Sequence, residues 1–423
     1  MYSKKEEKAR ILCISPFFAP LANSEAYCGS KLIRELVHYG YDVIVFSIEY
    51  EGTDPKGRRD DSKLWDELKD ITIRIPAHSN LNKIYSLLWV LHYQTPSWAR
   101  WIGSVIQAAN VLHREKPFDL IYSRSLPTFA HIPAYWLANL WRRPWIANFN
   151  DPWEGYLPNL KGAEKLKNPS LSLMGKIWLK RIFNRASYIT FPSERLGDFY
   201  VGKGKTNAKL KIIPHVGYES PKAYSKDNSN FSIVHAGKLG GLELTRSKAP
   251  DGFLKALREF LSKNPEARSV TRLVLVGPVD EQTERLGRMF DLDDVMTSPG
   301  LVSYEKSLDY IGSAAVCLLI EGKFDEGIYF PSKLADYIAA KKPVLALSPK
   351  IGVVADLARD KGVVRVDVDN IKEIEAAITD YYYAFQDRTM EERYPSDALA
   401  GTFKGRLIAE SFSNLVQQAL EKK

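Results

Sequence analysis

A lysine stands at the start of a predicted helix in the stretch FPSKLADYIAAKKPVLAL, residues 330–347. Pro331 and Ser332 are typical of a helix start, with Ser332 as the N-cap and Lys333 as the first helical residue. The positive end of the helix dipole disfavours a cation at that position. A bound anion would reverse this effect, because Lys333 and the first helix amides would then donate charge-assisted hydrogen bonds to it.

Asp336 lies one turn further along the same predicted helix. Its carboxylate would accept hydrogen bonds from the hydroxyl groups of a sugar ring, so Lys333 and Asp336 together indicate a diphosphate and a ribose. From helix physics alone, an ordinary solvated surface lysine is the favoured explanation of Lys333.

A second phosphate signal is the segment HAGKLGG, residues 235–241, at the end of a predicted strand. Gly237 and Gly240 would let backbone amides approach a phosphate, and Lys238 would add positive charge. The segment lacks the complete G-x-G-x-x-G pattern and the acidic residue that follows it in dinucleotide-binding folds, which disfavours a nicotinamide dehydrogenase.

Asp151, in the segment ANFNDPW, follows another predicted strand and places a carboxylate at its carboxyl end. A helix N-cap or a loop anchor is the alternative role for this residue. His131, in PTFAHIPAYW, is interpreted as a helix or core histidine rather than a catalyst.

The elements that must position these residues alternate between short apolar runs and amphipathic helix patterns. This alternation predicts parallel sheets built from βαβ units. The expected strands are 11–17, 42–48, 71–76, 119–125, 145–150 and 187–193, then 231–237, 271–277, 295–300, 314–321, 343–348 and 362–368. The expected helices include 30–40, 251–263, 281–290, 305–312 and 333–340.

The polar, aperiodic segment 219–230 resembles a linker, so we expect an α/β fold with two doubly wound Rossmann-like domains, 1–219 and 220–404. A final helix at about 405–423 is expected to pack back on the first domain. Ligands of parallel sheets bind at the carboxyl ends of strands, so two such domains are expected to face each other across a cleft.

Composition narrows the class of protein. The 423 residues are 45% hydrophobic and 26% charged, as in a folded globular protein. A net charge of +8 permits an anionic partner but does not identify one. The three cysteines, Cys13, Cys28 and Cys317, have no metal or disulfide spacing, which favours a reducing, cytoplasmic location. Neither a signal sequence nor a membrane-spanning stretch is predicted.

Residues 161–185 form a basic stretch with interleaved apolar residues, among them Trp178 and Ile182. Such a pattern suits the surface of an anionic membrane, with Trp89, Trp98 and Trp101 as further interfacial candidates. Helices packed on a sheet with a solvated charged face explain the pattern at least as well.

Several segments, taken in order, resemble family 4 glycosyltransferases of the GT-B fold, from residue 9 to residue 412. The resemblance is carried by residues 330–345, by SPFFAPLANSEAYCGSKLIRELVHYGYDVIVFS and by PWIANFNDPW, which is similar to a D-F-R-D-x-W segment of one branch. It is also carried by ASYITFPSERL, KIIPHVGYE, IVHAGKLGG, LVLVGP and SPGLVSYEKSLDYI.

The resemblance implies an acceptor-binding first domain and a nucleotide-sugar-binding second domain. Lys333, Lys238 and Arg246 would hold the donor diphosphate, with the amides of Ser332 and Leu334 nearby. Asp336 stands where the family usually has a glutamate for the ribose. In the first domain, the loop 22–29 would touch donor and acceptor through Gly29 and Ser30, and Asp151 would lie near the acceptor hydroxyl.

The chain departs from the family pattern at several positions. Ile328 occupies the place of an earlier glutamate, and Lys341 replaces the glycine after the helix, where a left-handed conformation costs about 1 kcal/mol. Asn148 and Asn150 replace an acid and an arginine, so the ion pair expected there is lost.

The expected function is therefore a retaining hexosyltransferase that moves a sugar from a UDP- or GDP-linked donor to an acceptor hydroxyl. The leaving diphosphate is thought to take the acceptor's proton in such enzymes, with Asp151, Lys238 and Lys333 as catalytic residues. A cofactor or metal is not expected. The acceptor would be a glycan or polyprenyl-linked molecule of bacterial surface-polysaccharide synthesis, at the inner face of the cell membrane.

Two alternatives remain open from the sequence. One is a nucleotide-sugar epimerase or hydrolase on the same fold, and the other is a non-catalytic, basic, membrane-binding protein. Nucleic acid is not expected as a partner, because no recognition motif accompanies the basic charge.

Overall fold

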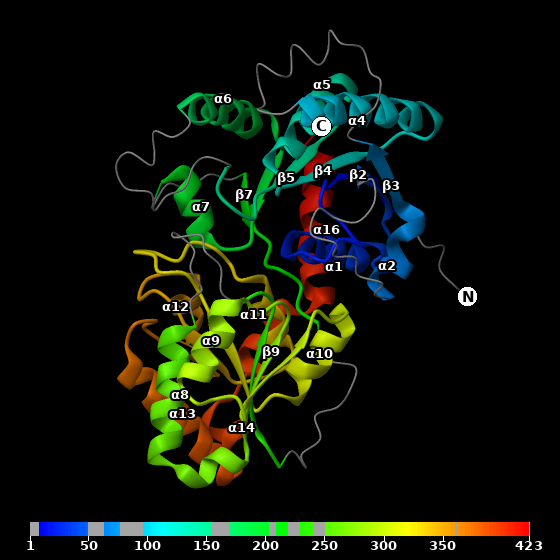
Figure 1. Ribbon diagram of the computed structural model, residues 1–423. Coiled ribbons are helices and arrows are strands. Elements are labelled where there is room, and N and C mark those ends of the chain that lie inside the picture. Colours follow the sequence, from blue (N-terminus) through cyan, green and yellow to red (C-terminus); the bar gives the residue numbers. More distant parts are fainter. Residues whose placement is uncertain are drawn as a thin grey trace, which may run out of the picture. The chain divides into compact units, whose positions relative to one another are not determined.

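The computed structural model describes residues 8–49, 63–76, 96–153, 169–202, 209–218, 229–239, 250–359 and 362–422, with the backbone alone at 96–99, 169–174 and 398. The chain forms two compact units, Met1–Pro214 with Gly405–Lys423, and His215–Lys404 (Figure 1). Most of the predicted linker, residues 219–228, lies outside the described residues.

The first unit is built on one parallel sheet. Within the described ranges it has seven strands in the order β3-β2-β1-β4-β5-β6-β7. The strands are β1 (Arg10–Ile14), β2 (Asp42–Glu49), β3 (Thr72–Pro76), β4 (Leu120–Arg124), β5 (Trp145–Asn148), β6 (Tyr188–Phe191) and β7 (Leu210–Ile212). Strand β4 is buried along its whole length, because helices cover both faces of the sheet.

The helices of the first unit connect these strands. They are α1 (Ser24–His38), α2 (Lys63–Leu68), α4 (Pro96–Glu115), α5 (His131–Trp141), α6 (Pro169–Arg185), α7 (Glu194–Val201) and α16 (Gly405–Glu421), with short 3₁₀ turns η1 (Lys69–Ile71) and η2 (Thr128–Ala130). Helix α1 begins at Ser24 because the Asn23 side chain accepts a hydrogen bond from the amide of Ala26. The predicted start near residue 30 was therefore too late.

Helix α16 lies beside α1, although the second unit separates them in the chain (Figure 1). The Tyr41 hydroxyl is hydrogen-bonded to the Ser413 hydroxyl at 2.7 Å, and the Phe412 ring packs edge-on against Tyr122. The apolar face of this final helix is thereby buried in the first unit.

The second unit repeats the same strand order. Six strands of the described chain pair as β10-β9-β8-β11-β12-β13, again in parallel. They are β8 (Phe231–Ala236), β9 (Thr271–Val276), β10 (Met296–Gly300), β11 (Val316–Ile320), β12 (Val344–Leu347) and β13 (Val363–Val366). Both units thus have the predicted doubly wound α/β topology, in which the strand order reverses beside the first strand.

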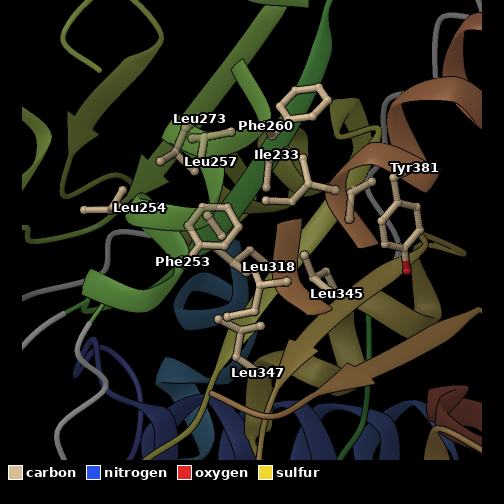
Figure 2. Packing of buried hydrophobic residues seen from close by; sticks show 14 of the residues in the cluster. Ile233, Phe253, Leu254, Leu257, Phe260, Leu273, Leu318, Leu345, Leu347 and Tyr381 are labelled. Carbon is tan, nitrogen blue, oxygen red and sulfur yellow. The ribbon is translucent and has the colours of Figure 1, made fainter. Parts of the chain in front are cut away.

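The helices and turns of the second unit are α8 (Asp251–Lys263), η4 (Pro265–Ser269), α9 (Glu281–Met289), α10 (Tyr304–Ser313), α11 (Ser332–Ala339), α12 (Val353–Leu357), α13 (Ile371–Gln386), α14 (Met390–Arg393), α15 (Asp397–Ala400) and η5 (Gly401–Phe403). Helices α8 and α13 lie side by side on the sheet. Figure 2 shows Phe253 and Leu257 of α8, Tyr381 of α13 and strand residues Ile233 and Leu345 in one apolar core.

Candidate active site

Helix α11 carries Lys333. Pro331 precedes the helix in extended backbone, and Ser332 is already its first residue, so the predicted N-cap role of Ser332 is wrong. The N-cap must be non-helical, and that conformation falls on Pro331 instead. Lys333 is therefore the second helical residue, still within the first turn, where the helix dipole disfavours a cation.

The ammonium group of Lys333 lies at the carboxyl end of strand β8. Its Nζ is 3.1 Å from Nε2 of His235, and a Cβ built on Gly237 would lie 3.0 Å from the same Nζ. The strand order reverses between β8 and β11, and ligands of doubly wound sheets bind at this switch point. The structure therefore brings Lys333 and Gly237, which are far apart in sequence, to one place.

Gly237 needs to be a glycine. Its φ is +107°, a left-handed conformation that disfavours other residues, and Gly277 at the end of β9 lies so close that a Cβ there would be 2.9 Å from the Gly237 carbonyl carbon. Lys238 follows as an exposed residue. Gly240 and Arg246 lie outside the described residues, so their predicted roles stay predictions.

Asp336 is buried and is engaged within the protein. Its Oδ1 accepts hydrogen bonds from the Tyr218 amide at 3.0 Å and from the Tyr304 hydroxyl at 2.9 Å. It thereby fastens the segment around Tyr218 and helix α10 to α11. Its contact with a ribose stays a prediction.

The amide of Leu334 donates to the carbonyl of Pro331 at 2.9 Å. Its predicted contact with a phosphate stays a prediction. Lys341, after the helix, has a φ of +55°, so the left-handed conformation predicted there is confirmed.

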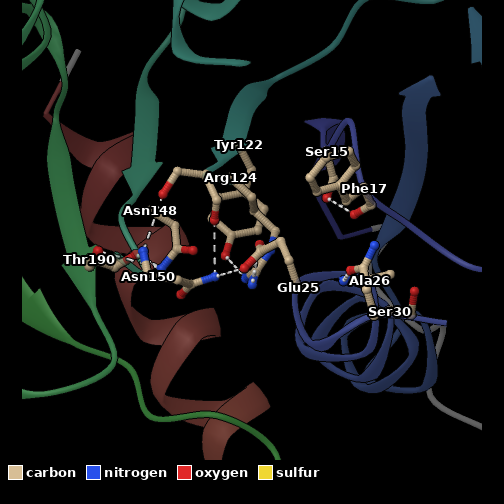
Figure 3. A network of polar contacts seen from close by, with 12 residues as sticks. Ser15, Phe17, Glu25, Ala26, Ser30, Tyr122, Arg124, Asn148, Asn150 and Thr190 are labelled. Carbon is tan, nitrogen blue, oxygen red and sulfur yellow. Dashed lines mark hydrogen bonds and ion pairs between the residues drawn. The ribbon is translucent and has the colours of Figure 1, made fainter. Parts of the chain in front are cut away.

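A buried polar network occupies the switch point of the first unit, between α1 and strands β4 and β5 (Figure 3). Arg124 donates to Oε1 of Glu25 at 3.2 Å and to the Tyr122 hydroxyl at 2.8 Å. The side-chain amide of Asn150 donates to Oε2 of Glu25 at 2.5 Å and to the Ser125 carbonyl at 3.0 Å. A fully buried ion pair is thus enclosed by neutral hydrogen-bonding groups.

The ion pair that Asn148 and Asn150 would replace is absent, as expected, but another pair lies nearby. The pair Glu25 and Arg124 provides one next to Asn150, while the Asn148 side chain donates to Thr190 Oγ1 at 3.1 Å. Neither charged residue was predicted to belong to a site. Two sequence features could have indicated them. Arg124 lies near the end of the predicted strand 119–125, and Glu25 lies shortly before the apolar face of the predicted helix 30–40.

Burial raises the pKa of the Glu25 carboxyl to about 7, against the opposing effects of Arg124 and Asn150. The carboxylate of Asp151 adds to the upward shift of this pKa. Asp151 itself is half-buried after β5, and its backbone carbonyl accepts a hydrogen bond from the Tyr200 hydroxyl at 2.9 Å. The predicted catalytic carboxylate therefore lies close to a second acidic group that titrates near neutral pH.

The sequence of the first unit matches the model of a known protein family. Residues 30–216 match the family model described as Glycosyltransferase Family 4. The match covers most of the first unit. No curated protein sequence matches the chain significantly.

Solved structures extend the likeness to both units. A sucrose-phosphate synthase from Thermosynechococcus elongatus superposes with a TM-score of 0.67 at 14% identity, over 98% of this chain and 100% of that one. HepE from Anabaena, in complex with UDP and glucose, gives 0.65 at 14% identity, over 97% and 100%. A UDP-N-acetylglucosamine 2-epimerase gives 0.53 at 12%, over 96% of each chain. These likenesses show the fold, which is GT-B as predicted.

Gly29 lies inside helix α1, not in the loop where it was predicted. A Cβ on Gly29 would lie 3.1 Å from Nε of Arg124 and 3.3 Å from Oγ of Ser15. The absence of a side chain at Gly29 therefore leaves space for the Arg124 side chain. The Ser30 side chain is also engaged within the protein, because its Oγ accepts a hydrogen bond from the Ala19 amide.

His131 is a core residue of the first unit, as interpreted from the sequence. It is fully buried, its Nδ1 is hydrogen-bonded to Ser123 Oγ at 2.8 Å, and its ring packs against Phe149. Burial lowers the pKa of this imidazole to about 3, so it remains neutral.

The apolar residues proposed for a membrane surface are largely buried in the first unit. Trp101, Trp178 and Ile182 are buried, while Lys176, Lys180 and Arg181 are exposed on α6. Trp101 is therefore no interfacial residue, and the packed-helix interpretation holds for the described part of 161–185. Trp89 and the side chain of Trp98 lie outside the described residues.

In the ranges that the structure describes, no helix is long and apolar enough to cross a bilayer. No cluster of metal-ligating side chains occurs among those same residues, and independence from a metal stays a prediction. Cys13, Cys28 and Cys317 are buried and unbridged.

Proposed function

We propose that the protein is a retaining glycosyltransferase that transfers a hexose from a UDP- or GDP-linked donor to an acceptor hydroxyl. The observation that carries this proposal is the ammonium of Lys333 beside Gly237, at the switch point of the second sheet. A cation and a side-chain-free backbone at that position suit the diphosphate of a nucleotide sugar. The Family 4 match of the first unit and the UDP complex of HepE support the same chemistry.

In the proposed reaction, Lys333 binds the diphosphate and stabilises the negative charge that develops on it as the sugar leaves. Lys238 and Arg246 add charge around the same group, and Asp336 approaches the ribose. Asp151 orients the acceptor hydroxyl, whose proton passes to the leaving diphosphate. The reaction then depends on positioning and on charge stabilisation rather than on a protein nucleophile.

The proposed acceptor is a glycan or polyprenyl-linked molecule of surface-polysaccharide synthesis. We place the enzyme in the cytoplasm, where the donors are made, at the inner face of the membrane. Exposed Lys176, Lys180 and Arg181 would favour contact with anionic lipid there.

Substitution of Lys333 by alanine tests the proposal. A nucleoside diphosphate at about 100 times its dissociation constant should stabilise the wild type by about 2.7 kcal/mol. Thermal unfolding with the diphosphates UDP, GDP and ADP, and with the monophosphate CMP, identifies the base. Lys333→Ala should bind that diphosphate about tenfold more weakly and lower the rate of sugar transfer about 100-fold. The matched control is Lys341→Ala, which removes a lysine from the opposite end of the helix and should bind like the wild type.

The proposal fails if none of the diphosphates stabilises the wild type, or if the two lysine variants behave alike. The epimerase among the similar structures supports a second candidate function, rearrangement of the donor's sugar. Incubation of the donor without acceptor separates the two. An epimerase converts the sugar under these conditions, whereas a transferase releases the nucleoside diphosphate only when acceptor is present.

A further inference from the structure

His235, the fifth residue of strand β8, is fully buried and bridges three elements. Its Nδ1 is 3.0 Å from the carbonyl oxygen of Leu318 on β11, and its Nε2 is 3.1 Å from Nζ of Lys333 on α11. His235 is the first residue of the segment HAGKLGG, and its sequence context alone indicates no role for it.

The two contacts fix the protons on the ring. A carbonyl oxygen only accepts hydrogen bonds, so Nδ1 carries the proton and donates to Leu318. In a neutral imidazole, Nε2 then has a free electron pair, which accepts a hydrogen bond from the Lys333 ammonium. One arrangement of protons thus satisfies the carbonyl, the ring and the lysine together.

The backbone around His235 holds this arrangement in place. The Tyr337 hydroxyl accepts a hydrogen bond from the Ala236 amide at 2.8 Å and donates to the same Leu318 carbonyl at 3.3 Å. Tyr337 and Lys333 both belong to α11, so the helix that carries the lysine is tied to the strand that carries the histidine.

A neutral hydrogen-bond acceptor beside Lys333 leaves the positive charge of this lysine available for a phosphate. The lysine side chain is long and flexible, and an ammonium near a helix start is repelled by the helix dipole. A hydrogen bond from Lys333 to an imidazole orients the ammonium without neutralising it, whereas a carboxylate in that place would compete with the phosphate. The missing side chain at Gly237 leaves the space in which the oriented ammonium lies.

We propose that His235 is a positioning residue that aims the Lys333 ammonium at the donor diphosphate. The inference rests on the proposed function of Lys333. It adds that recognition of the diphosphate depends on the Nε2 acceptor, and that the Nδ1 contact alone is insufficient.

Two amide variants separate the two contacts. The shorter side chain of His235→Asn places its amide near the Nδ1 position, where it can donate to Leu318, but it does not reach Lys333. The longer side chain of His235→Gln reaches the Nε2 position and can accept from Lys333. Calorimetric titration with UDP and with UMP measures how strongly each variant recognises the second phosphate.

We expect His235→Asn to bind UDP about tenfold more weakly while its UMP affinity stays within about twofold of the wild type. His235→Gln should retain UDP affinity within about threefold. In a Lys333→Ala background, His235→Asn should have no further effect, because the two residues act as one unit. His131→Asn, which alters an equally buried histidine of the first unit, should lower stability without changing the ratio of UDP to UMP affinity.

The inference is overturned if His235→Asn weakens UDP and UMP equally, if His235→Gln fails to retain UDP affinity while folded, or if His235→Asn weakens UDP further in the Lys333→Ala protein. The first two outcomes would assign the histidine a structural role only. A different failure, in which Lys333→Ala itself binds UDP as the wild type does, would refute the proposed function.

Discussion

Glu25 shows what a single buried carboxyl contributes to this protein. Its pKa of about 7 in the folded state exceeds the usual 4.5, because burial disfavours the charged form. Between these two pH values the folded state binds a proton that the unfolded chain has released. The contribution of Glu25 to the free energy of unfolding is therefore largest below pH 4.5, and it decreases as the pH rises to about 7.

We expect this to appear as a difference in pH dependence between the wild type and Glu25→Gln. From pH 8 to pH 5 the wild type should gain up to about 3 kcal/mol more stability than the variant, because each pKa unit corresponds to about 1.4 kcal/mol. Urea unfolding followed by tryptophan fluorescence is the appropriate measurement, since all nine tryptophans lie in the first unit. Equal pH dependence in the two proteins would contradict the assignment.

Only those residues of the candidate site that belong to a short, continuous sequence pattern could be predicted from the sequence. Lys333 and Gly237 were recognisable because a helix start and a strand end each have a short sequence pattern. Glu25 and Arg124 lie 99 positions apart, and the contact of Lys333 with His235 spans 98. No short pattern records such pairs, because the order of strands in the sheet brings them together.

Among the elements, the segment after the first unit packs closely on α11. Gly217 donates its amide to the Phe403 carbonyl, and a Cβ on it would lie 2.1 Å from the carbonyl oxygen of Ala335. The backbone of one segment is thus in direct contact with the backbone of the helix that carries Lys333.

Gly217→Ala should therefore destabilise the second unit by about 3 kcal/mol and also weaken UDP binding, because α11 or its neighbour must shift. The matched control is Gly401→Ala in the same unit, where a Cβ meets nothing within 4 Å. Thermal unfolding and UDP titration of both variants check this. A Gly217→Ala protein as stable as Gly401→Ala would show that the contact is looser than described.

The strands were predictable because buried parallel strands are continuous apolar runs, such as VCLLI in β11. Strand β7 was not predicted, since Leu210–Ile212 is short, lies at the sheet edge and is only partly buried. The start of α1 was missed because Asn23 and Glu25 are polar, although Glu25 turns inward to Arg124. Polar residues at a helix start therefore conceal the helix in the sequence when a distant residue, here Arg124, pairs with one of them in the fold.

At the scale of the whole molecule, α16 completes the first unit from the far end of the chain. Phe412 is fully buried, with its ring 4.8 Å from that of Tyr122. Phe412→Ala should destabilise the first unit by about 3 to 4 kcal/mol, and the urea midpoint of tryptophan fluorescence should fall accordingly.

The control for this variant is Phe260→Ala, an equally buried phenylalanine in the core of the second unit. Far-UV circular dichroism, which follows both units, should detect its effect, while the tryptophan signal reports the first unit alone. If Phe412→Ala leaves the tryptophan midpoint unchanged, α16 does not contribute to the stability of the first unit.

Because α16 follows the second unit in the chain but packs on the first, the first unit can be completed only after the second has been synthesised. Translation must pass through residues 215–404 before it supplies α16, which at about 5–20 residues per second takes roughly 10 to 40 s. During that interval the surface of α1 that receives α16 stays uncovered. The newly made first unit therefore exposes part of its apolar surface to aggregation and to chaperones for that whole interval, although its sequence comes first.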